Sequence, residues 1–178
     1  LYFNTTGASN TALGQGSLGA NTTAAGNTAI GKDAMLANTD GAGHVAVGFE
    51  ALSTNTQHSY STAIGYQALK ANGAAHANTA VGYQAGTANT TGASGTFIGS
   101  DAGKANTTGE SNVALGATAM QANTTGTRNI AIGFGAYDAS DTENDNIAIG
   151  YNAMTTNTAG GTNNLAIGNY ALDALTSA

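Results

Sequence analysis

A fixed spacing of 17 residues constrains the fold of this chain more than any other feature of its sequence. A glycine closes an Ala-aliphatic-Gly tripeptide, or its one Phe variant, in ten successive copies. These glycines are Gly14, Gly31, Gly48, Gly65, Gly82, Gly99, Gly116, Gly133, Gly150 and Gly168. The last step is 18 residues, because one residue is inserted in the predicted loop 157–163, and loops accept insertions at little cost. Residues 1–178 are therefore one continuous repeat array without linkers.

The repeat is too short for paired helices and long enough for short strands. A helical hairpin repeat needs at least ~30 residues. Thr28 and Ile30, like Ile130 and Ile132, put β-branched side chains two residues apart, which places both on one face of a strand. We predict an all-β fold, a parallel β-solenoid or β-roll of about ten 17-residue coils. Leu1 aligns with Leu18, so the chain opens in the middle of a coil.

The β-branched pairs are predicted to face the interior of the coil. After the glycine, a column of Leu or Met supplies the opposing apolar wall. This column is Leu18, Met35, Leu52, Leu69, Met120, Met154 and Leu172. Segments related to Asn-Thr-Thr-Gly, as at Asn21 and Asn89, are predicted to close each coil, because Asn and Gly tolerate positive φ.

The residue between the two β-branched positions is Ala in every complete copy except at Phe97. By alternation it should face away from the interior of the coil. Uniformly small side chains then indicate that another surface approaches closely, which predicts a subunit interface. The alternative is that this face packs on the chain's own loops. The predicted interface residues are Ala12, Ala29, Ala46, Ala63, Ala80, Ala114, Ala131, Ala148 and Ala166.

Composition excludes several classes of protein. Lys and Arg number only 4 and the formal net charge is -6, so no basic surface is available for nucleic acid. No apolar run approaches the ~20 residues that span a bilayer, so we expect no membrane insertion by this segment. Regularly spaced hydrophobic residues favour order over disorder. The absence of cysteine is typical of bacterial or viral surface fibres, which predicts an extracellular location on a cell or virion surface.

Short motifs in the repeats resemble a known family. Asn27-Thr28-Ala29-Ile30-Gly31 and Asn129-Ile130-Ala131-Ile132-Gly133 are similar to the Ser-Val-Ala-Ile-Gly type motif of YadA-like trimeric autotransporter adhesin heads. Comparable Asn-Thr-Ala-Ile-Gly repeats occur in phage and viral tail fibres. The resemblance covers nearly the whole chain and implies a left-handed β-roll, a homotrimer, and attachment to host or matrix surfaces. The period of 17 departs from the shorter intervals common in those heads.

The chemistry-bearing residues do not form a catalytic or metal-binding pattern. His44, His58 and His76 lie in separate coils at different phases of the repeat, so they form no metal triad. Asp138, Asp141, Glu143 and Asp145 offer oxygen ligands for Ca²⁺, but the nonapeptide of calcium-binding β-rolls is absent and a solvated loop is favoured. We expect no enzyme activity, no cofactor and no metal.

Aromatic residues recur directly after the repeat glycine and are candidates for contact with glycans. They are Phe49, Tyr66, Tyr83, Phe134 and Tyr151. Packing against adjacent loops is the alternative. The Asn-Thr-Thr triplets also fit the N-glycosylation sequon, but turn geometry is sufficient to explain them.

The repeat therefore predicts a structural extracellular fibre or adhesin segment that mediates surface attachment. Two alternatives stay open. A regular solenoid with threonine ladders is a known ice-binding design, although Thr28, Thr62 and Thr79 share their column with Val and Ile. Unpaired strand edges at the two ends would also permit end-to-end stacking into a filament.

Overall fold

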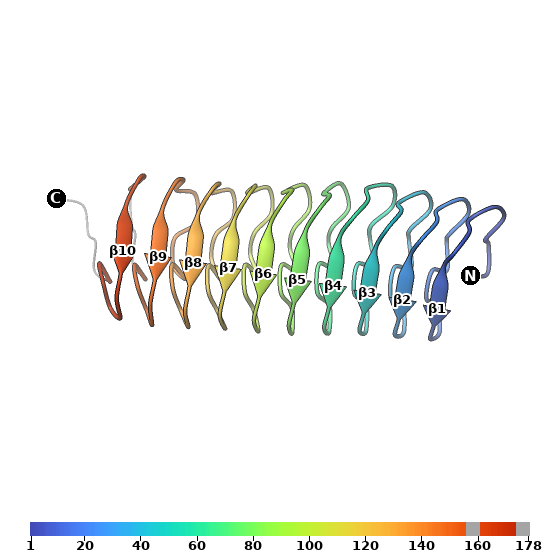
Figure 1. Cartoon of the computed structure of the whole chain (residues 1–178), viewed down its shortest axis with the longest axis horizontal. Helices are drawn as coiled ribbons and strands as arrows, with labels where there is room; N and C mark the ends of the chain where they lie inside the picture. The colour runs from blue at the N-terminus through green and yellow to red at the C-terminus, as the bar shows by residue number, and fades with distance from the viewer. Residues whose placement is uncertain (156–160, 174–178) are drawn as a thin grey trace.

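The computed structural model describes residues 1–155 and 161–173, and it shows a rod built from one strand per repeat (Figure 1). Ten three-residue strands form a single parallel sheet in chain order. They are β1 Thr11–Leu13, β2 Thr28–Ile30, β3 Val45–Val47, β4 Thr62–Ile64, β5 Thr79–Val81, β6 Thr96–Ile98, β7 Val113–Leu115, β8 Ile130–Ile132, β9 Ile147–Ile149 and β10 Leu165–Ile167. The predicted all-β solenoid of tandem repeats is confirmed.

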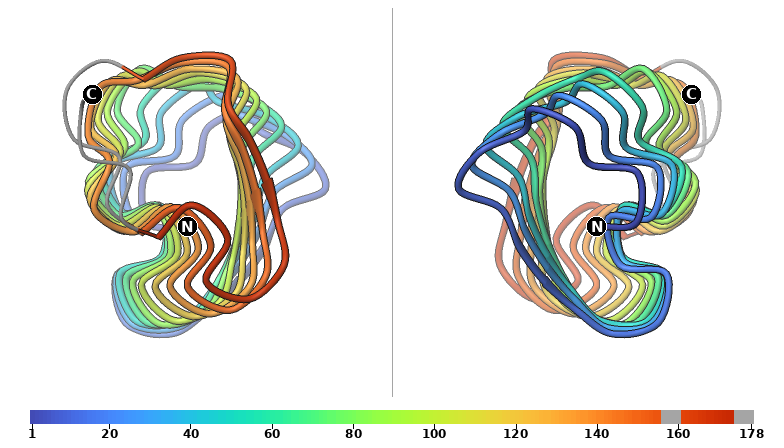
Figure 2. Two further views of the ribbon diagram at one scale, coloured as in Figure 1. Left: turned by 90° about the vertical axis from the view of Figure 1, so that its left-hand side faces the viewer. Right: turned by 90° about the vertical axis from the view of Figure 1, so that its right-hand side faces the viewer.

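The register of the sheet follows the sequence period. Thr28 pairs with Val45 and Ala29 with Ala46, which are steps of 17, whereas Ile147 pairs with Leu165, a step of 18. The inserted residue therefore lies between β9 and β10, in a loop that falls partly outside the described residues. Successive coils turn progressively along the rod (Figure 2), as expected from the right-handed twist of strands. The sheet is thus a long, narrow, twisted ribbon.

The facing of the strands is opposite to the prediction. Eight of the nine alanines at the central strand position are buried, and Ala12 in the first coil packs against the same core. Their neighbours on each strand, such as Ile130 and Ile132, are partly exposed on the outer face. The alanine column is therefore not a subunit interface, because all its side chains except Ala12 in the first coil are buried inside the chain's own coils. The correction covers Ala12, Ala29, Ala46, Ala63, Ala80, Ala114, Ala131, Ala148 and Ala166.

A narrow interior explains this inversion. Six of the seven residues in the predicted Leu and Met column form the opposing wall, and Leu18, Met35 and Met120 among them are completely buried. Leu172, in the last coil, is exposed and does not contribute to this wall. A second alanine column, one residue earlier, is buried beside it and includes Ala34, which the sequence analysis missed. Because the large side chains already fill the coil, only a methyl group fits on the strand that faces them.

The asparagines that open the predicted turn segments are core residues in every coil from Asn21 to Asn123, and none of these has the positive φ predicted for the turn. Positive φ occurs elsewhere, for example at Leu18 (φ 48°) and Leu69 (φ 49°). Asn106 is completely buried, donates from Nδ2 to Asn89 Oδ1 at 2.8 Å and to Gly109 O at 3.0 Å, and accepts from Asn123 Nδ2 at 2.8 Å. These amides form a ladder along the rod that satisfies buried polar groups from one coil to the next.

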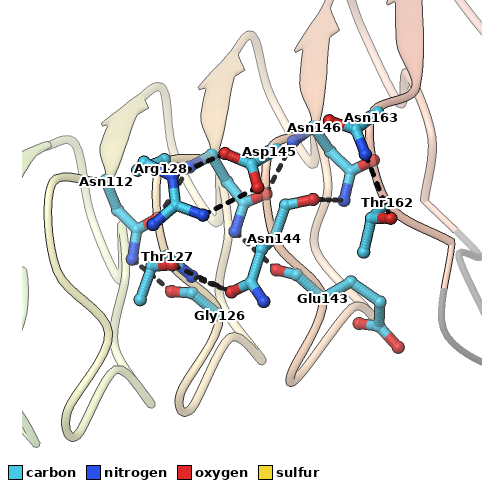
Figure 3. Close-up of polar contacts among 11 residues, drawn as sticks. Asn112, Gly126, Thr127, Arg128, Glu143, Asn144, Asp145, Asn146, Thr162 and Asn163 are labelled. Atoms are coloured by element: carbon cyan, nitrogen blue, oxygen red, sulfur yellow. Dashed lines mark hydrogen bonds and ion pairs between the residues drawn. The ribbon is translucent and has the colours of Figure 1, made fainter.

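A second asparagine column precedes the strands. Asn112 Oδ1 accepts from the Asn129 backbone N–H at 2.9 Å, and Asn112 Nδ2 donates to Gly126 O at 2.7 Å (Figure 3). Asn129 repeats both contacts one coil further on, with the backbone N–H of Asn146 and the carbonyl of Glu143. Each side chain thus joins two coils, which couples the repeats through hydrogen bonds as well as through apolar contacts.

Candidate interaction face

The outer surface of the sheet is an uncharged stripe that follows the whole rod. Every outward strand residue in the ten described strands is Thr, Val, Ile or Leu. We call this surface the strand face. Its first column is Thr11, Thr28, Val45, Thr62, Thr79, Thr96, Val113, Ile130, Ile147 and Leu165, and its second is Leu13, Ile30, Val47, Ile64, Val81, Ile98, Leu115, Ile132, Ile149 and Ile167.

The strand face is long, and some of its aliphatic side chains remain exposed to solvent even in the middle of the rod. Nine strand spacings of ~4.8 Å give a length of about 43 Å. Ile64 is 39% exposed and Leu115 is 42% exposed in the middle of the array, where neighbouring strands already cover both sides. A continuous, uncharged and largely aliphatic surface of this length is unusual on a monomer and marks a surface for interaction.

The chemistry of the strand face changes along the rod. Its threonines all lie in β1 to β6, whereas β7 to β10 present only Val, Leu and Ile. The threonines predicted to point inward, such as Thr28 and Thr79, point outward. The C-terminal part of the face is therefore more apolar than the N-terminal part.

Two aromatic stacks border the strand face, one residue after the repeat glycine. Phe49, Tyr66 and Tyr83 stack with ring centroids 5.2 and 5.4 Å apart. Phe134 and Tyr151 stack at 5.4 Å in the second group. At these separations parallel rings are offset and cover part of one another's faces. The five predicted glycan-contact residues are therefore brought together as two groups, and most of their ring faces are shared with neighbouring rings.

A second column of threonines lies in the turn segments, directly after the buried asparagines, and its hydroxyls bond to backbone carbonyls. Thr90 Oγ1 donates to Thr107 O at 3.0 Å, and Thr107 Oγ1 donates to Thr124 O at 2.9 Å. Each hydroxyl thus reinforces the contact between two coils. These threonines stabilise the stack of coils and do not present a row of free donors.

The basic side chains are paired with carboxylates. Lys70 Nζ lies 2.6 Å from Glu50 Oε2, and the pKa of Glu50 is lowered by hydrogen bonds from Lys70 and then Gln67. Arg128 contacts both carboxylate oxygens of Asp145, at 2.6 and 2.7 Å, on the exposed surface (Figure 3) and lowers the pKa of Asp145. The remaining pairs are Lys32 with Asp33 and Lys104 with Asp101. No free basic patch is left among these residues.

The acidic residues near β9 do not form a cation site. Asp138, Asp141, Glu143 and Asp145 are not brought together, and no cluster of three or more His, Cys, Asp or Glu side chains suited to a metal occurs within residues 1–155 and 161–173. Burial raises the pKa of Asp138, while Asp145 is paired with Arg128. The four carboxylates have separate surroundings.

His44 is the one histidine enclosed by the core. It replaces Asn in the second asparagine column, where its Nδ1 accepts from the Ser61 backbone N–H at 3.1 Å and its Nε2 contacts the His58 carbonyl oxygen. These partners assign the neutral tautomer with the proton on Nε2. Burial lowers the pKa of His44. His58 and His76 stack on the surface with centroids 6.5 Å apart.

The Asn-Thr-Thr sequons at Asn21, Asn89, Asn106 and Asn123 are inaccessible in the folded chain. All four amides are completely buried and hydrogen-bonded in the ladder. A glycan attached there would have to displace the core of the coil. These sequons are therefore structural.

Comparison of the chain with protein-family models, curated proteins and solved structures gives no match. The described coils contain no pocket, and no helix among them is long and apolar enough to cross a membrane. The strand face and its aromatic border are therefore the candidate interaction surfaces of the described coils.

Proposed function

We propose that the chain is a rigid, non-enzymatic segment of an extracellular fibre or adhesin, in which copies of the chain associate along the strand face. The observation that carries the proposal is the continuous uncharged stripe of Thr, Val, Ile and Leu on all ten strands. Internal repetition supplies length and stiffness, because each coil is hydrogen-bonded to the next. The resemblance to adhesin-head and tail-fibre motifs, and the absence of cysteine, support a cell-surface or virion-surface location.

A second copy of the chain fits the strand face better than an unrelated partner. Both copies carry ridges at the same inter-strand spacing, so aliphatic side chains of one can interdigitate with those of the other over the full length. The twist of the ribbon favours chains that wind around a common axis. Three chains around that axis is the arrangement implied by the family resemblance.

Light scattering coupled to size-exclusion chromatography tests the association. We expect a mass near three times the 17.4 kDa protomer. Ile132→Asp places a charge in the centre of the aliphatic part of the strand face and should yield folded monomer. Thr108→Asp adds the same charge on an exposed turn away from the sheet and should leave the oligomer unchanged. A monomeric parent chain, or an Ile132→Asp variant that keeps the parent mass, would reject the interface.

Attachment follows from repetition. Weak contacts repeated in several chains of one fibre convert into strong binding when the fibre engages a host or matrix surface at several points. Adhesion of beads coated with the oligomer, compared with beads coated with Ile132→Asp at equal density, measures this contribution. Equal adhesion of both preparations would show that attachment does not depend on assembly of the chains.

Ice binding is the second candidate, and the outward position of Thr28, Thr62 and Thr79 favours it. These hydroxyls lie on the open face in repeating positions. The twist of the sheet and the aliphatic β7 to β10 weigh against a match to a planar lattice. Thermal hysteresis in the parent chain that disappears in Thr79→Arg would replace the fibre proposal, and no hysteresis would reject ice binding.

A further inference from the structure

The two aromatic stacks are separated by a gap in their column. Ser100 and Ala117 occupy the corresponding positions after β6 and β7, between Tyr83 of the first stack and Phe134 of the second. Three strand spacings separate these two rings, which is about 14 Å. The aromatic column is therefore interrupted between Tyr83 and Phe134 by two small residues, Ser100 and Ala117, and we call this interruption the notch, its end rings the walls and its two small residues the floor.

The outer ends of the stacks are covered and the inner ends are open. Lys32 Nζ lies 5.6 Å from the centroid of Phe49 and covers the first stack, while Tyr170 meets Tyr151 edge to face at 5.3 Å and covers the second. Tyr83 and Phe134 have a stacked ring on one side only.

The exposed fractions of the aromatic side chains agree with open inner ends and covered outer ends. Tyr83 is 50% and Phe134 is 51% exposed, compared with 43% for Tyr66 and for Tyr151. The rings that border the notch are therefore the most open of these four, and each has a face that no other ring covers.

The floor of the notch provides hydrogen-bonding groups without a net charge. The exposed Ser100 hydroxyl lies 3.4 Å from Asp101 Oδ2, and Asp101 Oδ1 is 3.0 Å from Lys104 Nζ. The Ser100 hydroxyl can donate to and accept from ligand hydroxyl groups, while the neutralised Asp101–Lys104 pair beside it offers little attraction to a charged ligand. An apolar wall beside neutral polar groups is the usual composition of a small-molecule site.

We propose that this notch binds a neutral, gluco-configured oligosaccharide, with one sugar ring against Tyr83 and another against Phe134. A gluco-configured pyranose carries its substituents at its rim and exposes C–H groups on both faces, which suits stacking on an aromatic wall. A single flat ring held from both sides would need only ~7–8 Å between the walls. The ligand therefore needs two rings to use both walls. The inference rests on the attachment role proposed above and gives it a ligand class.

Filling the notch tests the proposal without disturbing the fold. Ser100→Tyr/Ala117→Tyr would complete the column with a residue that already occurs there at Tyr66 and Tyr83. Gln15→Tyr adds the same side chain to the same column outside the notch and is the matched control. Saturation-transfer difference NMR with cellotetraose as the probe measures contact, and titration gives the affinity.

We expect transfer to cellotetraose from the parent chain and from Gln15→Tyr, and at least a tenfold weaker affinity in Ser100→Tyr/Ala117→Tyr and in Tyr83→Ala. Methyl β-glucoside, which has one ring, should bind at least tenfold more weakly than cellotetraose. No transfer from cellotetraose, or equal affinity in the filled variant, would overturn the proposal. Light scattering on the parent chain and on each variant reports assembly separately, so a parent chain that forms the oligomer but does not bind cellotetraose would reject the notch and leave the fibre proposal standing.

Discussion

Phe97 occupies the space that Gly103 leaves open in the Leu and Met column. Gly86 and Gly103 stand in that column where Leu, Met or Tyr occurs in other coils. A Cβ atom on Gly103 would collide with the Phe97 ring, and one on Gly86 would lie 2.9 Å from Phe97 Cδ2. Gly95 is similarly close, at 2.7 Å. One large side chain on the strand therefore replaces two on the opposing wall, and the interior stays filled.

Phe97→Ala should destabilise the array by about 3–5 kcal/mol, because the glycines opposite leave a cavity. Adding Gly86→Leu and Gly103→Leu restores the pattern of the other coils and should recover most of the loss. Leucine tolerates the required backbone, since Leu18 and Leu69 already adopt positive φ in this column. Urea denaturation followed by circular dichroism measures both effects. A triple variant no more stable than Phe97→Ala would contradict this account of the packing.

The period, the parallel register and the Leu and Met wall could be predicted from sequence because they depend only on spacing. The facing of the strands could not, because a three-residue strand has two sets of side chains and alternation does not say which is inside. The usual preference for Ile and Val in the core fails in a coil this narrow. The informative signal was size: the inward position is almost always Ala, and its one exception, Phe97, is matched by glycines on the opposite wall.

The buried asparagine ladder could not be predicted from the sequence either. The Asn-Thr-Thr-Gly motif is typical of a turn, which predicts exposed asparagines. The structure instead places Asn89 and Asn106 in a buried ladder of hydrogen-bonded amides. The aromatic column could be read from the sequence at Tyr83 and Phe134, but the covered and open ends of its stacks depend on side-chain positions.

The variants Ala80→Arg and Val81→Arg test which side of strand β5 faces the core, because they place the same charge on opposite faces of the strand. Ala80 is completely buried, so an arginine there leaves an unpaired charge in the core and should cost at least ~3 kcal/mol. Val81 is on the strand face, where arginine can reach solvent and should preserve the folded coil while it weakens association. Thermal unfolding and light scattering on both variants measure this difference. Equal unfolding midpoints for the two variants would disprove the assigned facing.

His44 should make the array less stable as the pH falls. The folded chain lowers the pKa of this histidine below the 6.5 of a free side chain, so the unfolded chain binds the proton more tightly. Its contribution is therefore present above about pH 6.5 and is lost as the pH drops toward the folded pKa, by at most ~1.4 kcal/mol per pH unit. Protonation would also turn Nδ1 into a donor facing the Ser61 N–H.

His44→Asn restores the residue found at Asn27 and Asn78 in the same column and should flatten the stability profile between pH 7.5 and 5. Urea midpoints measured across that range for both chains give the comparison. The same slope in the variant would assign the pH dependence to other groups.

Asn106→Asp tests whether the amide ladder holds the coils together. The substitution keeps the shape but replaces a donor with an oxygen that faces Asn89 Oδ1 and Gly109 O. Leaving these two acceptors unpaired should cost at least ~2 kcal/mol. Because the new carboxyl is buried among acceptors, its pKa should rise, so the loss should be largest above neutral pH and smaller in acid. Thr108→Asp carries the same charge two residues away, at the position that Asp40 occupies in its own coil, and should leave the urea midpoint almost unchanged. If both variants unfold at the parent midpoint, the ladder contributes no net stability and the apolar columns alone hold the coils in register.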